Sequence, residues 1–167
     1  MAAFALVAFA GCNGLDSPQF TVRDTAVVVR SSAAFTRQPD LPARVESTID
    51  ASLAYWGGTW SQLSGKMIVL DGSAHVSCTG HEGAVGCYDG DIQVSTQDAG
   101  STLHCVEETV LVHEIGHAII GDPNHLDPRW MDFSPVFQAL QGRTGYSDAG
   151  DGSCPIYVSM WRHPPQP

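Results

Sequence analysis

Two histidines and a glutamate at helical spacing constrain this chain more than any other feature. They stand in the stretch His113-Glu114-Ile115-Gly116-His117. Residues four apart lie on one face of a helix, one turn above the other, so both imidazoles can converge on one ion without bending the backbone. Glu114 is rotated around the helix and can reach a water molecule in an open coordination position. The stretch therefore predicts a helix that borders a metal site.

The surrounding residues predict that this helix is buried. Ser101 or Thr102 can supply the N-cap, and Gly121 marks the end of the helix. Apolar residues recur on more than one face, which is typical of a helix packed inside a protein: Leu103, Val106, Val110, Leu111, Val112, Ile115, Ala118 and Ile119. Buried imidazoles need polar partners, and a metal ion would satisfy both.

The pattern H-E-x-x-H is the signature of zinc proteases, in which the histidines bind the metal and the glutamate is the general base. Zinc lowers the pKa of a bound water to about 7, and a nearby carboxylate can take its proton. After the helix, His125 is the favoured third ligand and Asp122 the alternative, since carboxylates also bind zinc. No Glu follows His117, which excludes a third ligand of the thermolysin kind.

This part of the chain resembles the metzincin metalloproteases, and among them the matrixins. That family reads H-E-x-x-H-x-x-G-x-x-H before a Met-turn, whereas this chain reads H-E-x-x-H-x-x-x-G-x-x-x-H. The span from His113 to Met131 is that of a typical matrixin, and Asp127-Pro128 precede the methionine as in that family. The resemblance implies zinc ligands His113, His117 and His125, the general base Glu114, and Met131 as a hydrophobic floor under the metal.

The resemblance also implies an α+β, metzincin-like (zincin) fold, with a twisted mixed sheet, an active-site helix and a loop-rich C-terminal part. The sequence fits this order: a strand within 20–30, a helix from Pro42 to Trp56, a strand at 67–70, a Gly-rich connection with a hairpin over 71–90, a strand at 91–96 and a short helix near 134–141. The family has an antiparallel edge strand above the cleft, where a peptide binds by strand addition. Ile92, Gln93 and Val94 are the candidate residues for that edge.

Length and composition fit one domain, which we expect to span residues 20–167. The chain has 167 residues, of which 43% are hydrophobic, enough for a core of its own. A formal net charge of -10 argues against nucleic acid, whose phosphates attract Lys and Arg. We expect a monomer that acts on a peptide or protein substrate.

Residues 1–12 predict an export signal. The apolar run has the length of a signal h-region and is too short to cross a bilayer as a mature helix. Its end, Phe9-Ala10-Gly11-Cys12, resembles a bacterial lipobox, although no Lys or Arg precedes the run. We expect lipidation at Cys12, a tether over 13–19, and a place in the bacterial cell envelope or outside the cell. An ordinary signal and a buried terminal strand are the alternatives.

The other four cysteines suit two disulfides in an exported protein. We favour Cys78–Cys87, which closes a short Gly-rich loop, and Cys105–Cys154, which ties the zinc helix to the C-terminal segment. Two Asp-Gly turns, at 89–91 and 148–152, leave calcium open as a second ion, although neither matches an EF-hand.

These features favour a small exported zinc endopeptidase that hydrolyses peptide bonds with zinc-activated water and Glu114 as general base. Two other functions stay open: a non-catalytic surface lipoprotein stabilised by zinc, and a zinc hydrolase of cell-wall amide bonds. Glu114 disfavours the non-catalytic protein, because a purely structural site would not need this carboxylate.

Overall fold

The computed structural model describes residues 20–29, 41–96 and 108–140. Within these ranges the fold is α+β, with a five-stranded mixed sheet and four α-helices. None of the helices in these ranges is long and apolar enough to cross a membrane. Several predicted features lie outside the described residues: the signal segment 1–12 with Cys12, the tether 13–19, the N-cap at Ser101 or Thr102, the Cys105–Cys154 disulfide and the turn at 148–152.

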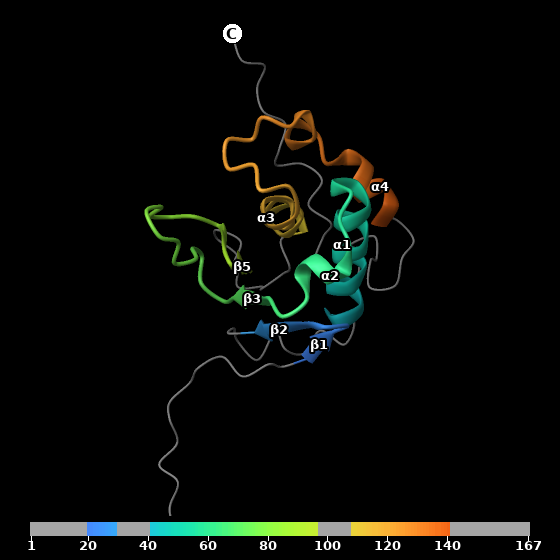
Figure 1. Cartoon of the computed structure of the whole chain (residues 1–167). Coiled ribbons are helices and arrows are strands. Elements are labelled where there is room, and N and C mark those ends of the chain that lie inside the picture. Colours follow the sequence, from blue (N-terminus) through green and yellow to red (C-terminus); the bar gives the residue numbers. More distant parts are fainter. Residues whose placement is uncertain (1–19, 30–40, 97–107, 141–167) are drawn as a thin grey trace, which may run out of the picture.

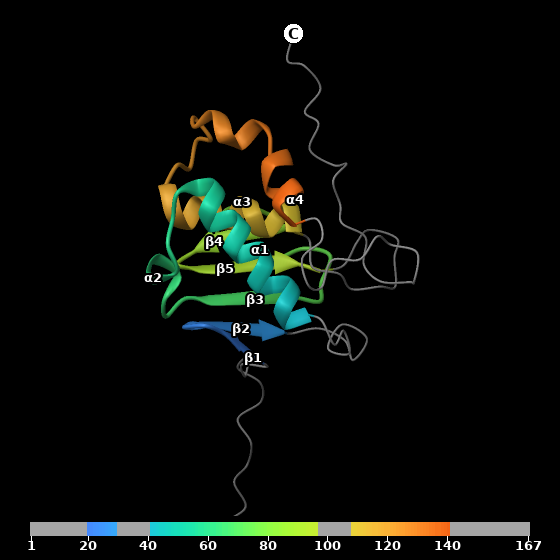
Figure 2. The ribbon, with the colours of Figure 1, turned by 90° about the vertical axis from the view of Figure 1, so that its right-hand side faces the viewer.

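The sheet has the strand order β1-β2-β3-β5-β4. β1 (Phe20–Val22) and β2 (Thr25–Val29) form an antiparallel hairpin, and β2 runs parallel to β3 (Met67–Asp71). β5 (Asp91–Ser95) is parallel to β3 on one side and antiparallel to β4 (Gly86–Asp89) on the other. Figures 1 and 2 show α1 and α3 on the same face of this sheet.

The sheet differs from the prediction at two points. The first strand is interrupted at Arg23, whose φ of 50° turns the chain into a hairpin. The strand with Ile92, Gln93 and Val94 is not at the edge, because β5 pairs with both β3 and β4. The antiparallel edge strand next to β5 is β4, which lies in the Gly-rich connection where the sequence shows no alternating apolar pattern.

The predicted helices are present. α1 (Leu41–Trp56) buries Val45, Ile49, Leu53 and Trp56 at helical spacing, and α2 (Trp60–Leu63) is a short turn after it. α3 (Glu108–Ile120) ends before Gly121, whose φ of 62° suits glycine. A 3-10 helix, η2 (Pro128–Met131), and α4 (Ser134–Leu140) follow.

α1 and α3 are joined by two polar contacts inside the core. The Nε1 atom of Trp56 donates to the carbonyl oxygen of Val112 at 2.8 Å. The Arg44 guanidinium donates to the carboxylate of Glu108, and both side chains are almost fully buried. Burial raises the pKa of Glu108, and the neighbouring Arg44 acts in the opposite direction. Removing one partner of such a pair leaves an uncompensated buried charge, so the two helices depend on each other.

Gly116 sets how closely α3 approaches its aromatic neighbours. A Cβ atom at this position would lie 2.7 Å from ring atoms of both Trp56 and Trp130. The two indoles pack together with ring centroids 4.5 Å apart and ring planes tilted by 47°. Rigid rings cannot yield as the end of a flexible side chain does, so the absence of a side chain at Gly116 permits this packing.

We expect Gly116→Ala to destabilise the protein. Alanine is favoured over glycine in a helix by about 1 kcal/mol, but overpacking a core costs about 1–3 kcal/mol, and two indole rings must move. Because rigid rings place the cost in the upper half of that range, about 2–3 kcal/mol, the free energy of unfolding, measured with denaturant, should fall by about 1–2 kcal/mol. Ala54→Ser on the exposed side of α1 is the control. A Gly116→Ala protein as stable as the wild type would contradict the packing argument.

Candidate metal centre

The structure brings His113, His117 and His125 together. Their Nε2 atoms form a triangle with sides of 3.1 Å. A neutral imidazole has one ring N–H, so three nitrogens that face one another cannot all be satisfied by hydrogen bonds. An ion about 2.0–2.1 Å from each nitrogen would satisfy all three, with angles of about 100° between ligands and with room for further ligands. The three histidines can therefore hold a metal ion.

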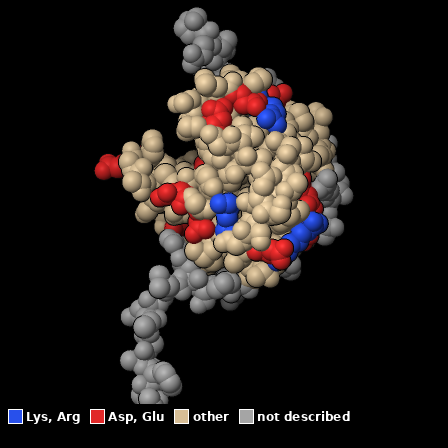
Figure 3. Space-filling view, viewed as in Figure 1, with Lys and Arg blue, Asp and Glu red and all other residues tan. Residues whose placement is uncertain are grey.

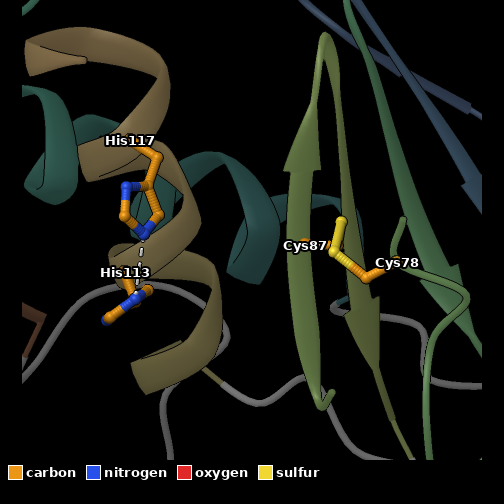
Figure 4. Close-up of a disulfide and its surroundings, with 4 residues drawn as sticks. All are labelled: Cys78, Cys87, His113 and His117. Atoms are coloured by element: carbon orange, nitrogen blue, oxygen red, sulfur yellow. Dashed lines mark hydrogen bonds between the residues drawn. A yellow bond between two sulfur atoms is a disulfide. The ribbon is translucent and has the colours of Figure 1, made fainter. Parts of the chain in front are cut away.

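Two elements supply the cluster. His113 and His117 lie one turn apart on α3 and extend to the same side of the helix, as Figure 4 shows. His125 comes from the loop that follows, and its φ of 55° lies in the left-handed region. Few residues other than glycine adopt this conformation, so its neighbours must hold it there.

The two helix imidazoles are kept neutral by their surroundings. Burial, with the neighbouring His117 and His125, lowers the pKa of His113 from its ordinary 6.5 to about 3. Burial and His125 lower the pKa of His117 as well. A metal ion binds the neutral form of imidazole, so at neutral pH these two side chains do not have to lose a proton first.

The backbone of Asp122 acts on His117 in the opposite direction. Its interaction with the imidazole raises the pKa of His117, whereas burial and His125 lower it. A metal-binding histidine commonly has a backbone partner at its second ring nitrogen, which leaves the other nitrogen as the ligand atom.

The carboxylate of Asp122, the alternative third ligand, does not belong to the cluster. It accepts hydrogen bonds from the backbone nitrogens of Asn124 and Asp127 at 3.2 and 2.8 Å, and from Nε1 of Trp130 at 3.0 Å. The geometry therefore favours His125 as the third ligand.

Trp130, rather than Met131, lies against the histidines. Its ring centroid is 4.6–4.8 Å from the centroids of all three imidazoles, and the side chain is buried. Met131 is 60% exposed, so the prediction of a buried methionine floor is wrong. Both residues belong to η2, where neighbouring side chains point about 120° apart, and only one can face inward. The one sign in the sequence that residue 130 faces the histidines is that it is aromatic and directly precedes the methionine.

Glu114 lies buried on the inner side of α3. Its side chain is 6% exposed, and burial raises its pKa from 4.5 to about 7. A Cβ atom on Gly86 would lie 2.5 Å from Oε1 of Glu114 and 2.4 Å from Cγ1 of Val110. β4 can therefore approach the carboxylate only because residue 86 has no side chain. A group with this pKa can accept and return a proton near neutral pH.

A cavity of about 640 Å³ lies beside the cluster. Histidines 113, 117 and 125 line it together with Glu114, and the opposite wall comes from β4 and the connection before it. The predicted disulfide Cys78–Cys87 is confirmed and ties this connection to β4, with 5.7 Å between the Cα atoms (Figure 4). In Figure 1 the connection projects from the sheet.

The histidine cluster is the only group of three or more metal-ligating side chains found among the described residues. In the predicted turn at 89–91, the Asp91 carboxylate accepts a hydrogen bond from the Met67 backbone at 2.9 Å. Calcium binding at this turn stays a prediction.

Ionisation of Glu114 should destabilise the metal-free protein. Its pKa is about 7 in the folded state against an ordinary 4.5, so the unfolded chain releases this proton first and stability falls as pH rises from 4.5 to 7. Glu114→Gln should raise the free energy of unfolding at pH 8 by up to about 3 kcal/mol and change it little at pH 4.5. Denaturant titrations of the metal-free proteins at both pH values measure this. Glu46→Gln, on α1, is the control, and an equal gain there, or one independent of pH, would contradict the explanation.

Comparison with known proteins finds no matching family model, no similar curated protein and no similar solved structure.

Proposed function

We propose that this chain is a zinc-dependent endopeptidase with a metzincin-like fold. The observation that carries the proposal is the triangle of three imidazole nitrogens with a buried glutamate on the same helix, beside an open cavity. Imidazole ligands suit zinc. Three protein ligands with a free position are typical of catalytic zinc, whereas structural zinc has four protein ligands.

The three histidines and Glu114 would have separate chemical roles. A bound zinc ion would supply Lewis-acid polarisation of the scissile carbonyl and acidify a water molecule. His113, His117 and His125 would hold the ion and leave a position open toward the cavity. Glu114 would accept the water proton and pass it to the leaving amine, a double role that suits a pKa near 7.

An extended peptide fits the site better than a compact substrate. β4 is an edge strand, and its residues Gly86, Cys87 and Tyr88 line the cavity that also contains Glu114 and the histidines. A peptide that adds to this edge by main-chain hydrogen bonds would cross the metal centre. We therefore propose that the substrate binds along β4, and not along β5 as the sequence predicted.

Surface charge fits the expected lack of nucleic-acid binding. On the face drawn in Figure 3, the few Lys and Arg side chains lie next to Asp and Glu. In the structure, the Arg23 guanidinium lies 3.3 Å from the Glu46 carboxylate and 3.6 Å from the Asp50 carboxylate. Export, lipidation at Cys12 and a monomeric state stay part of the proposal, and the Cys78–Cys87 disulfide fits an oxidising compartment.

Glu114→Ala should keep zinc and lose hydrolysis. We expect one zinc per chain in the variant, measured by elemental analysis, and a kcat lower by about 10²–10⁴-fold on a cleaved peptide. His113→Ala should lose the metal as well as the activity. Glu46→Ala is the control for both assays. Unchanged turnover in Glu114→Ala, or full zinc content in His113→Ala, would rule out the mechanism.

The substrate class needs its own comparison. A broad peptide library and a purified cell-wall digest should be offered to the same preparation, with Glu114→Ala as the blank. Cleavage of the library alone supports an endopeptidase. Cleavage of the digest alone supports the cell-wall alternative, and zinc binding with neither activity supports a non-catalytic protein.

Gly86→Ala should impair hydrolysis without loss of zinc. The added methyl group collides with the Glu114 carboxylate, and a displacement of about 1 Å can cost about 10²-fold in rate. We expect a fall in kcat of about 10–100-fold with unchanged zinc stoichiometry. Val85→Ala, at the exposed start of the same segment, is the control. Normal kcat in Gly86→Ala would show that β4 does not set the position of the base.

A further inference from the structure

The Asp122 carboxylate lies outside the histidine cluster but bonds to the loop that carries His125 and to Trp130. We propose that Asp122 is a positioning residue, which fixes the loop that presents His125 and the indole that supports all three imidazoles. This inference rests on the proposed metal site.

The first step is the loop itself. The Asp122 carboxylate accepts hydrogen bonds from the backbone nitrogens of Asn124 and Asp127. These bonds bracket His125, one before it and one after it. His125 has the left-handed φ of 55°, a conformation that the chain keeps only where its surroundings enforce it. The carboxylate thus compensates for the strained backbone that turns this imidazole toward the other two.

The second step is the indole. The oxygen that accepts from the Asp127 backbone, Oδ2, also accepts from Nε1 of Trp130 at 3.0 Å. Trp56 and Gly116 hold the body of the same ring. The indole is therefore fixed both at its N–H edge and across its surface. Since all three imidazoles pack against it, a rotation of this ring would displace all three ligand atoms.

The two steps meet at one residue. Asp122 restrains His125 through the loop and the whole cluster through Trp130. Outer partners of this kind commonly change metal affinity by about 10–100-fold when they are replaced.

The chain offers a matched control. Asp132 is an exposed aspartate close to η2, and its carboxylate accepts from the backbone nitrogen of Ser134 at 2.9 Å at the start of α4. Its carbonyl oxygen lies 2.7 Å from the Tyr55 hydroxyl. Asp132→Asn therefore removes a similar charge and a similar turn contact without reaching the cluster.

The experiment measures metal binding, not hydrolysis, with the full chain. Zinc affinity is determined by competition with a chromophoric chelator, and cobalt is substituted to record its visible absorption spectrum. Asp122→Asn should weaken zinc binding by about 10–100-fold and alter the cobalt spectrum, because the amide nitrogen cannot accept the bonds now made to Oδ2. Trp130→Phe, which keeps a ring but removes the N–H donor, should lower the affinity by a smaller factor. Asp132→Asn should match the wild type in both measurements.

The outcomes separate the rival explanations. Zinc affinity in Asp122→Asn within twofold of the wild type overturns the inference, as does an equal loss in Asp132→Asn. If His125→Ala keeps its affinity while Asp122→Asn loses it, Asp122 is a ligand and the positioning role is wrong. If Asp122→Asn does not fold, Trp130→Phe decides: wild-type affinity there overturns the inference and a loss supports it. A wild-type protein that binds zinc without cleaving any peptide would refute the proposed function but not this inference.

Discussion

The packing of two indole rings against Gly116 determines where the metal ligands lie. Trp56 belongs to α1 and is bonded to the backbone of α3, while Trp130 belongs to η2 and supports the imidazoles. The Tyr55 hydroxyl adds a further link, since it lies 2.6 and 2.7 Å from the carbonyl oxygens of Arg129 and Asp132. Helix α1 therefore holds η2 and α3 in place although it contributes no metal ligand. Ligands held by a packed core are oriented before the ion arrives, which is what a precise metal site requires.

The same core contains charges that oppose folding. The Arg44–Glu108 pair is almost fully buried. Glu114 is also buried, and burial raises its pKa. The pair is of the kind that hydrophobic residues can often replace without loss of stability. Glu114 differs, since it is a desolvated carboxylate that lines the same cavity as three imidazoles. The proposed role of Glu114 as a proton acceptor gives a functional reason for its cost in stability.

The sequence predicted those features whose signals are local. The spacing of apolar residues in α1 and α3, the end of α3 at Gly121 and the short loop closed by Cys78–Cys87 are each determined by residues near one another in the chain. The edge position of β4 was missed because strand order depends on pairing between distant segments, and Gly86 and its neighbours give no apolar alternation. Met131 was mistaken for the floor because the direction of a side chain in η2 depends on what α1 and α3 place opposite it. The three histidines could be predicted as candidates, but their convergence depends on a loop conformation that spacing does not reveal.

The disulfide beside the cavity restrains a part of the chain that does not belong to the packed core. Most residues from 77 to 85 are exposed and bury little apolar surface, so the outer wall of the cavity has almost no core of its own. The covalent link to Cys87 restrains this wall in place of hydrophobic packing. Substitutions in residues 77–85 can consequently leave the packing around Gly116 and the indoles unchanged. Under the proposed function, the residues that would select a substrate and those that stabilise the fold lie in different parts of the chain.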